Sequence, residues 1–210
     1  MISVVLADDH ALIREGIKKV LTRQPDLEVV YEAGTAQEVL DFLAKATANI
    51  IIMDINLPGM SGLDALKFVR KLSPTVQVLM LSMYPEDRFA IRALKAGAAG
   101  YLTKGTAADE LIAAIKKVSG GKRYVSASTA EMLAEELGGP ADRLPHETLS
   151  DREFQILMMI VQGKSVKGIS RELVLSINTI NTYRARILDK MNMVSVQDLM
   201  RYAFDNNLIQ

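Results

Sequence analysis

Cysteine is absent from this 210-residue sequence, tryptophan is absent too, and there are only two histidines. Without cysteine there is no disulfide framework, no thiolate nucleophile and no cysteine-based zinc site. His10 and His146 each lack a second histidine at ligand spacing, which argues against zinc chemistry. The functional chemistry of the chain must therefore rest on other side chains.

Long hydrophobic runs are missing as well. The longest apolar stretches, such as residues 50–53, fall far short of the ~18 residues that a membrane-spanning helix needs. The first residues show neither the basic flank nor the cleavage site of a signal peptide. A composition of 49% hydrophobic and 24% charged residues is typical of one large or two small globular domains. We expect a soluble, cytoplasmic protein with no membrane partner.

There is no net charge of either sign, because 25 basic residues balance 25 acidic ones. The distribution is uneven, since residues 149–210 hold eight basic and six acidic residues and form a net-positive segment. That excess is too small to indicate a nucleic-acid partner by itself. The case for such a partner must come from particular side chains.

The first 120 residues repeat a strand-then-helix pattern. Five short apolar or β-branched runs end in turn residues, at 3–7, 28–33, 50–53, 77–81 and 100–103. Several of the helical segments that follow open with a capping box, formed by Thr35 with Glu38, Ser61 with Asp64, and Thr106 with Asp109. The alternation predicts an α/β domain of the flavodoxin-like, doubly wound type, with a parallel five-stranded sheet.

The pattern changes after residue 118. Glycine and proline punctuate residues 119–148, which also contain one predicted helix at 128–137, so we interpret this segment as a linker between domains 1–118 and 149–210. In the second domain the strands stop. A helix capped by Ser150 and Glu153 and stopped at Gly163 is followed by helical segments at 165–173, 176–191 and 195–205. We predict an all-α domain of four helices.

Acidic residues follow two strands of the predicted sheet. Asp8 and Asp9 come directly after the first strand, and Asp54 directly after the third. Ligands of such sheets bind beyond the carboxyl ends of the strands, and in a strand order of 2-1-3-4-5 these two strands are neighbours. Three converging carboxylates would repel one another. Lys104, after the fifth strand, leaves a charge of −2, which one Mg²⁺ ion with oxygen ligands would cancel.

The pocket residues together resemble the receiver domain of response regulators, over residues 2–118. The matching elements are Asp8-Asp9, Asp54 with the following residues 55–62, Ser82, and residues 101–104. The resemblance implies that Asp54 accepts a phosphoryl group from a sensor histidine kinase. The family often has a proline after the lysine, where this chain has Gly105.

The same resemblance implies roles for the neighbouring side chains. Asp9, Asp54 and the carbonyl of Asn56 would bind Mg²⁺ directly, with Asp8 acting through water. Ser82 and Lys104 would each take a phosphoryl oxygen, and Tyr101 would fill the space that Ser82 vacates when it moves inward.

Plainer interpretations remain open for single residues. A carboxylate at a strand end often only caps the next helix, which is the alternative for Asp8 taken alone. We interpret His10 as a first-turn helix residue rather than a ligand or phosphodonor, and Tyr101 by itself would be an ordinary strand aromatic. Asn56 argues against a phosphatase, which needs a second acid two residues after the nucleophile. We therefore expect a phosphoacceptor regulator, with at most slow self-dephosphorylation, rather than an enzyme.

Residues 165–191 have the pattern of two helices joined by a short turn. One apolar stripe recurs at spacings of three and four and predicts the core face, with Ile169, Leu173, Ile177, Ile180, Ile187, Leu188 and Met191. The opposite face of the second helix is polar, small and basic, with Asn178, Asn181, Thr182, Ala185 and Arg186. Such a face fits a DNA major groove, although any small helical bundle also shows a polar outer face.

Residues 149–210 are similar to the LuxR-type helix-turn-helix of NarL/FixJ regulators. The similarity rests on residues 149–153, 163–165, 179–184 and 190–191. It implies base contacts by Asn181, Thr182 and Ala185. It also implies contacts to the DNA backbone by Thr179, Tyr183, Arg184, Arg186 and Lys190. The family frequently has lysine where this chain has Asn178 or Asn181.

Both resemblances together imply a two-component transcription regulator. Phosphorylation would free the recognition helix for promoter DNA and favour a homodimer, for which the last helix offers the apolar residues Val196, Leu199, Met200 and Ala203. RNA polymerase is a further partner that this interpretation allows. Two rivals stay open: an adaptor that acts on another protein without phosphorylation, and a phosphatase.

Overall fold

The computed structural model describes residues 1–138 and 144–209. The chain divides into two compact units, Met1–Gly139 and Pro140–Gln210. The division falls inside the segment 119–148 that the sequence predicts to be a linker. Within the described ranges, no helix combines the length and the hydropathy that crossing a membrane would require.

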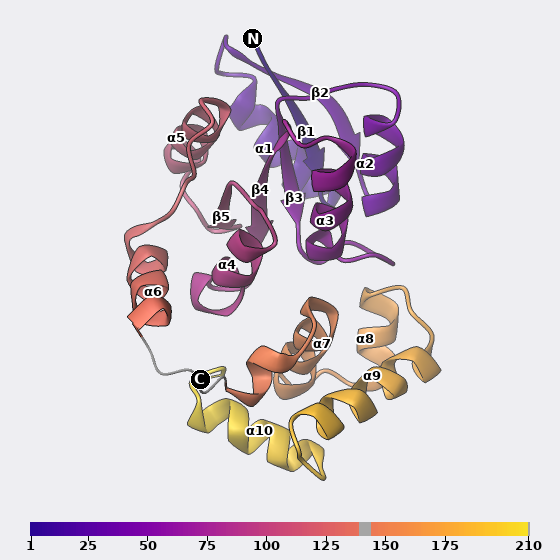
Figure 1. The fold of residues 1–210 in the computed structure, drawn as a ribbon. Helices are drawn as coiled ribbons and strands as arrows, with labels where there is room; N and C mark the ends of the chain where they lie inside the picture. The colour runs from indigo at the N-terminus through magenta and orange to yellow at the C-terminus, as the bar shows by residue number, and fades with distance from the viewer. Residues whose placement is uncertain (139–143, 210) are drawn as a thin grey trace. The chain divides into compact units, whose positions relative to one another are not determined.

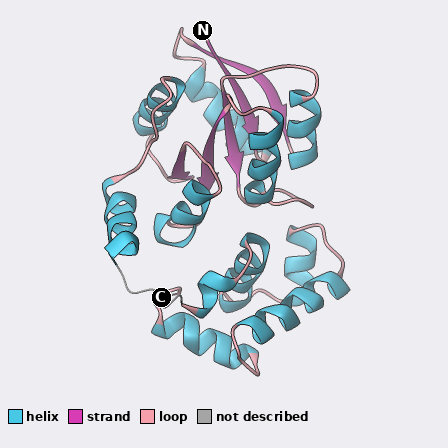
Figure 2. Ribbon diagram, in the orientation of Figure 1, coloured by secondary structure: helices cyan, strands magenta, loops and turns pink. Residues whose placement is uncertain are grey.

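The first unit is a parallel sheet with helices on both faces (Figures 1 and 2). The sheet contains β1 (Ile2–Ala7), β2 (Leu27–Ala33), β3 (Ile50–Asp54), β4 (Gln77–Ser82) and β5 (Gly100–Thr103). The strand order is β2-β1-β3-β4-β5. The helices are α1 (Ala11–Leu21), α2 (Ala36–Leu43), α3 (Gly62–Leu72), α4 (Glu86–Lys95), α5 (Ala108–Ser119) and α6 (Ala127–Gly138). The predicted doubly wound fold is confirmed.

The central strands are buried between two layers of helices. All five residues of β3 are buried, as expected for a parallel strand that is covered on both faces. On one face, Leu6 and Ile52 belong to a core that includes Leu21 of α1 and Ile115 of α5. Helices α2, α3 and α4 lie on the other face (Figure 1). This packing holds the carboxyl ends of β1, β3 and β5 along one edge of the sheet.

Two of the three predicted capping boxes in this unit place the helix start correctly, and one is wrong. Thr35 and Ser61 accept the backbone N–H of Glu38 and Asp64 and begin α2 and α3. Helix α5 instead begins after Ala107, which offers no side-chain cap. The Thr106 hydroxyl lies 3.2 Å from that of Thr103, so it is satisfied within the turn rather than at the helix end.

Part of the predicted linker is attached to the first unit. The backbone N–H of Tyr124 donates to the carbonyl of Ala99 at 2.8 Å, and Tyr124 forms a parallel bridge with Gly100 beside β5. Helix α6, predicted at 128–137, then packs against α4. Residues 139–143 of the predicted linker lie outside the described residues.

Among the described residues of the second unit, all regular secondary structure is helical. It contains the 3₁₀ helix η1 (Pro145–Thr148) and the helices α7 (Asp151–Val161), α8 (Val166–Glu172), α9 (Ile177–Lys190) and α10 (Val196–Asp205). Each of the four α-helices is capped by a serine that accepts a backbone N–H three residues on, namely Ser150, Ser165, Ser176 and Ser195. The predicted four-helix class is confirmed.

The predicted apolar stripe of residues 169–191 forms core except at two positions, since Leu188 is half-buried and Ile177 is exposed. Ile169, Ile180 and Ile187 are fully buried. Ile177, which the sequence pattern predicts to be core, is 48% exposed. Ile177 is the first residue of α9, next to the turn. At this end of the helix its side chain stays in contact with solvent, although its spacing to Ile180 matches the apolar stripe.

Candidate functional site

The carboxyl ends of β1 and β3 bring two aspartates together. Ala7 pairs with Met53 in the parallel register, and Asp8 and Asp54 follow these residues. Both are almost completely buried, at 3% and 2% exposure. Asp9 points to a more open position, with a side chain that is 33% exposed. The sequence prediction that these carboxylates share one edge of the sheet agrees with this geometry.

Lys104 is the cation of this pocket. It follows β5, and its Nζ lies 2.6 Å from Asp8 Oδ2 and 2.7 Å from Asp54 Oδ2. The lysine side chain is only 3% exposed. Burial acts to lower the pKa of Lys104, but the charges and hydrogen bonds of Asp54 and Asp8 outweigh it and raise that pKa. The ammonium group therefore stays charged between the two carboxylates.

Asp54 is left with one unsatisfied oxygen. Burial raises the pKa of Asp54, the positive charge of Lys104 opposes this, and Asp8 adds to it. Oδ2 pairs with Lys104, whereas Oδ1 is buried and has no hydrogen-bond partner in the described chain. A buried carboxylate oxygen without a partner is costly unless a cation or another ligand serves it. The donor set, all oxygen and with an unbalanced negative charge, fits Mg²⁺.

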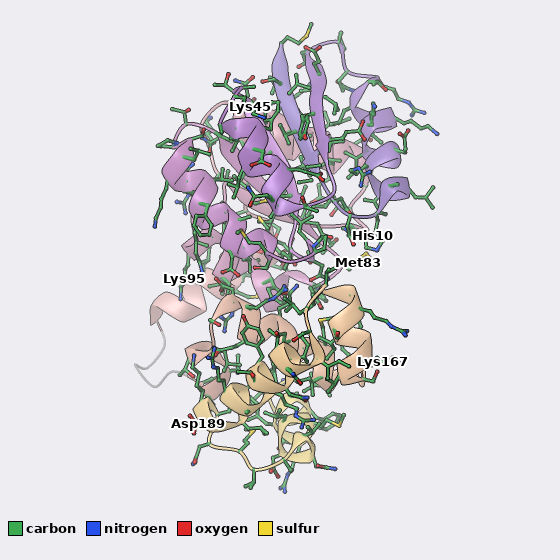
Figure 3. The ribbon with its side chains drawn as sticks, turned by 90° about the vertical axis from the view of Figure 1, so that its right-hand side faces the viewer. His10, Lys45, Met83, Lys95, Lys167 and Asp189 are labelled. Atoms are coloured by element: carbon green, nitrogen blue, oxygen red, sulfur yellow. The ribbon has the colours of Figure 1, made fainter. Side chains whose placement is uncertain are left out.

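His10 lies closer to the acidic cluster than the sequence analysis indicated. It is the N-cap residue of α1, just before the first turn, and its Nδ1 lies 2.7 Å from Asp9 Oδ1 and 3.2 Å from Asp8 Oδ1. Ligand atoms of Asp8, Asp9, His10 and Asp54 all lie within 4.8 Å of one another. His10 is labelled in Figure 3. In the sequence, only the position of His10 directly after Asp8 and Asp9 indicates that it could lie in the acidic cluster.

Asp8 contacts both the turn before α1 and the lysine of the pocket. Its Oδ1 accepts the backbone N–H of His10 at 2.9 Å, which stabilises the turn before α1. Its Oδ2 faces Lys104. Asp8 therefore belongs to the pocket and to the turn before α1, but it does not cap the helix, because the N-cap residue His10 is the one whose N–H it accepts and α1 has no side-chain cap.

Ser82 and Tyr101 hold the same short loop. The Ser82 hydroxyl accepts the backbone N–H of Tyr84 at 3.1 Å, and the Tyr101 hydroxyl donates to the Tyr84 carbonyl at 2.7 Å. Ser82 is fully buried and Tyr101 is 2% exposed. Burial also raises the pKa of Tyr101, so its hydroxyl remains a donor. The two residues predicted to move together thus share one backbone partner.

The loop after β3 depends on a glycine. Asn56 is half-buried, and its nearby backbone N–H works to lower the pKa of the Asp54 carboxyl group. The N–H of Gly62 donates to the carbonyl of Ile55 at 2.9 Å. A Cβ atom on Gly62 would lie 1.9 Å from the backbone oxygen of Asp54. Only glycine allows α3 to start this close to the end of β3.

Helix α9 presents the predicted polar face. Among the proposed base contacts, Asn181, Thr182 and Ala185 are all exposed, as is Arg186. Thr179, Tyr183 and Arg184 are half-buried. Figure 3 labels Asp189 on this helix and Lys167 on α8, and both side chains are exposed.

Three of these side chains already have partners inside the second unit. The Thr182 hydroxyl donates to the carbonyl of Asn178 at 2.9 Å, and the Thr179 hydroxyl lies 2.8 Å from that of Ser176. Lys190 Nζ lies 2.7 Å from Glu153 Oε2. A contact of Lys190 with a phosphate group would therefore compete with Glu153.

Comparison with known proteins matches both units. Residues 4–116 match the response regulator receiver domain, and residues 147–203 match the bacterial regulatory proteins of the luxR family. The response regulator GacA of Pseudomonas aeruginosa is 36% identical over 210 residues, which is all of this chain and 98% of that protein. The response regulator UvrY of Escherichia coli is 34% identical, over 99% of this chain and 96% of that protein.

Solved structures agree with these matches. A LuxR-family two-component response regulator from Aurantimonas sp. is 34% identical, with a TM-score of 0.61 over 66% of this chain and 99% of that one. RcsB of Salmonella enterica, bound to promoter rprA in the presence of a phosphomimetic, has a TM-score of 0.65 over 96% of this chain and 97% of that one. At 23% identity, RcsB supports the fold alone. This chain belongs to the NarL/FixJ family of two-component response regulators, which join a receiver domain to a LuxR-type DNA-binding domain.

Proposed function

We propose that a sensor histidine kinase phosphorylates Asp54 and that the phosphoryl group controls promoter binding by α9. The observation that carries this proposal is the buried pair of Asp54 and Lys104, with Asp54 Oδ1 left unpartnered at the edge of the sheet. In the transfer, an Asp54 oxygen forms a bond to phosphorus as the phosphorus–nitrogen bond of the donor imidazole breaks, and a proton returns to that imidazole. Phosphoryl transfer of this kind requires mainly positioning and charge neutralisation.

Each residue of the pocket has a part in this reaction. Lys104, already 2.7 Å from Asp54 Oδ2, would pair with a phosphoryl oxygen, and the Ser82 hydroxyl would hold another. Asp8, Asp9, Asp54 and the carbonyl of Asn56 would hold Mg²⁺, which would offset the negative charge of the phosphoryl group. Because Asn56 supplies an amide in place of a second acid, we propose at most slow self-dephosphorylation.

The second unit would bind double-stranded DNA in the cytoplasm. We propose that Asn181, Thr182 and Ala185 contact base edges, while Thr179, Tyr183, Arg184, Arg186 and Lys190 hold the backbone. RcsB bound to a promoter is a related architecture. On helix α10, Met200 is 37% exposed and Phe204 is 66% exposed. These apolar side chains support a homodimer that forms through this helix on paired half-sites. RNA polymerase would be a further partner at the promoter.

Replacement of the acceptor tests the phosphorylation step. Asp54→Asn keeps the shape of the side chain but removes the nucleophilic carboxylate, so we expect no label on the protein from a radioactive small-molecule phosphodonor with Mg²⁺. Asp41→Asn is the matched control, since Asp41 is an exposed carboxylate on α2, and it should be labelled like the wild type. Persistent labelling of Asp54→Asn would refute the assignment of the acceptor.

A further inference from the structure

One carboxylate oxygen holds the beginning of α6. Glu86 is the first residue of α4, and its Oε2 accepts hydrogen bonds from the hydroxyls of Ser126, Ser128 at 2.6 Å and Thr129 at 2.9 Å. Thr129 is 2% exposed. Burial acts to raise the pKa of Glu86, but the three hydroxyl bonds outweigh it and lower that pKa. Glu86 is therefore an ionised acceptor, and hydrogen bonds to a charged acceptor are stronger than neutral ones.

The same carboxylate sits at the N-terminus of a twelve-residue helix. The Ser126 hydroxyl accepts the backbone N–H of Thr129 at 3.1 Å, and it also donates to Glu86. A negative charge is favourable where backbone N–H groups at a helix start are unpaired. Helix α6 packs on α4 and is the last element of the first unit. The hydrogen bonds of Glu86 therefore hold against α4 the segment that leads to the DNA-binding domain.

Glu86 is also close in sequence to the switch pair. Only residues 83–85 separate it from Ser82, and Tyr84 in this loop is bound by Ser82 through its N–H and by Tyr101 through its carbonyl. If the Ser82 hydroxyl turns to a phosphoryl oxygen, it no longer accepts the Tyr84 N–H. If Tyr101 follows, the hydrogen bond from its hydroxyl to the Tyr84 carbonyl breaks as well. These two hydrogen bonds of Tyr84 would therefore change with the state of Asp54.

We propose that Glu86 with Ser126, Ser128 and Thr129 forms a latch that holds α6 on α4 in the unphosphorylated chain, and that phosphorylation opens the latch through residues 83–85. This inference rests on the proposed function, because it takes Asp54 as the phosphoacceptor. Opening the latch loosens the start of α6, and the second unit is then tethered less firmly. A change at Asp54 would thereby be transmitted to the start of α6 through the short segment 83–86.

Amide hydrogen exchange of α6 in the full chain tests the latch, with and without acetyl phosphate plus Mg²⁺, while intact mass reports phosphorylation. The variants are Glu86→Gln, which removes the charge, and Ser128→Ala, which removes one exposed hydroxyl. Without phosphodonor we expect α6 to exchange about tenfold faster in Glu86→Gln and less so in Ser128→Ala, since each loses charge-assisted hydrogen bonds. Glu131→Gln, an exposed carboxylate on α6 itself, should match the wild type.

Phosphodonor should accelerate α6 exchange in the wild type and in Glu131→Gln, but add little in Glu86→Gln, whose latch is already open. The latch is refuted if the protein is phosphorylated normally while α6 exchange stays unchanged, or if Glu86→Gln exchanges like the wild type without phosphodonor. If intact mass shows no phosphorylation of the wild type, the proposed function fails and the release step with it, whatever Glu86→Gln does.

Discussion

Lys104 determines the electrostatics of the acidic pocket. It is in contact with both buried carboxylates, Asp8 and Asp54, so the three side chains carry one excess negative charge away from water. An unpaired buried charge is expensive, so the excess negative charge favours binding of a divalent cation, and that cation together with Lys104 would then have to neutralise the further negative charge of a phosphoryl group. A phosphoryl oxygen must take Lys104 from its present partners, and Mg²⁺ would offset the charge that remains on Asp8.

Gly62→Ala tests how closely α3 must approach the acceptor strand. A Cβ atom would lie 1.9 Å from the Asp54 carbonyl oxygen, so the backbone at Asp54 has to shift. We expect the free energy of unfolding to fall by roughly 1–3 kcal/mol, as for other overpacked sites, and labelling of Asp54 to slow. Urea unfolding and labelling with a phosphodonor measure the two effects.

Gly16→Ala is the control for that substitution. A Cβ atom at Gly16, in the middle of α1, meets nothing within 4 Å. This variant should be more stable by roughly 0.5–1 kcal/mol, because alanine is the better helix former. Equal stability of the two variants would argue against the close contact at Gly62.

Two substitutions on α9 separate affinity from specificity. Arg186→Ala removes a proposed backbone contact and should weaken DNA binding about equally on all sequences. Thr182→Ala removes a proposed base contact, so this variant should change its preference between DNA sequences. Binding of the full chain to a library of DNA fragments, at one stated salt concentration, measures both. If neither variant alters binding, α9 is not the recognition helix.

At the scale of elements, Glu153 joins the start of α7 to the end of α9. Its Oε2 accepts the Ser150 N–H at 2.8 Å and the Lys190 ammonium at 2.7 Å. Burial acts to raise the pKa of Glu153, yet these bonds outweigh it and lower that pKa below its usual 4.5. One carboxylate thus closes a capping box and ties together two helices of the DNA-binding domain.

A lowered pKa gives this link a defined pH dependence. The stabilisation is fully present above pH 4.5 and is lost as the pH falls through the lower pKa of the folded state. At pH 7, Glu153→Gln should cost the second unit about 1 kcal/mol, because Lys190 is partly exposed and solvent screens the pair. The difference from the wild type should shrink as the pH drops below 4.5.

Urea unfolding followed by the ring signals of Tyr183 and Tyr202, both in the second unit, measures this effect. Glu172→Gln breaks an exposed pair with Lys164 and should cost only a few tenths of a kcal/mol. A cost of Glu153→Gln that does not change between pH 7 and pH 3 would contradict the ionised link.

Helices and strands were predictable from the sequence where hydrophobic period and caps agree. All five strands and the helices capped by Thr35, Ser61, Ser150 and Ser195 lie where the pattern places them. Thr106 failed as a cap because its hydroxyl has a partner in the turn, and Ile177 failed as core because it begins its helix. Both errors come from local geometry at the end of an element, which periodicity does not encode.

At the scale of the whole molecule, the sequence predicts the acidic pocket but not the contacts between α4 and α6. The rule that parallel strands present their carboxyl ends together is enough to bring Asp8, Asp54 and Lys104 to one place. The hydrogen bonds between Glu86 and the start of α6 join residues some forty positions apart, and no local sequence pattern predicts them. For the part of the predicted linker that packs on α4, the sequence predicts the helix but gives no information on what the helix packs against.

The two units must be coupled for phosphorylation to regulate DNA binding. A modification shifts a two-state equilibrium only by its differential effect on the two states, and going from 1:99 to 99:1 takes ~5.5 kcal/mol. The new charge on Asp54, bound Mg²⁺, the opened latch and dimer contacts on DNA would contribute together. No single contact has to supply the whole difference.

The most direct test is DNA binding by the purified full chain, with and without acetyl phosphate plus Mg²⁺, in parallel with Asp54→Asn. We predict that phosphodonor raises the affinity for a promoter fragment about tenfold or more, within the usual range of allosteric coupling, and leaves Asp54→Asn unchanged. Equal affinity of the wild type in both conditions, or no retention of DNA at low salt, would contradict the account.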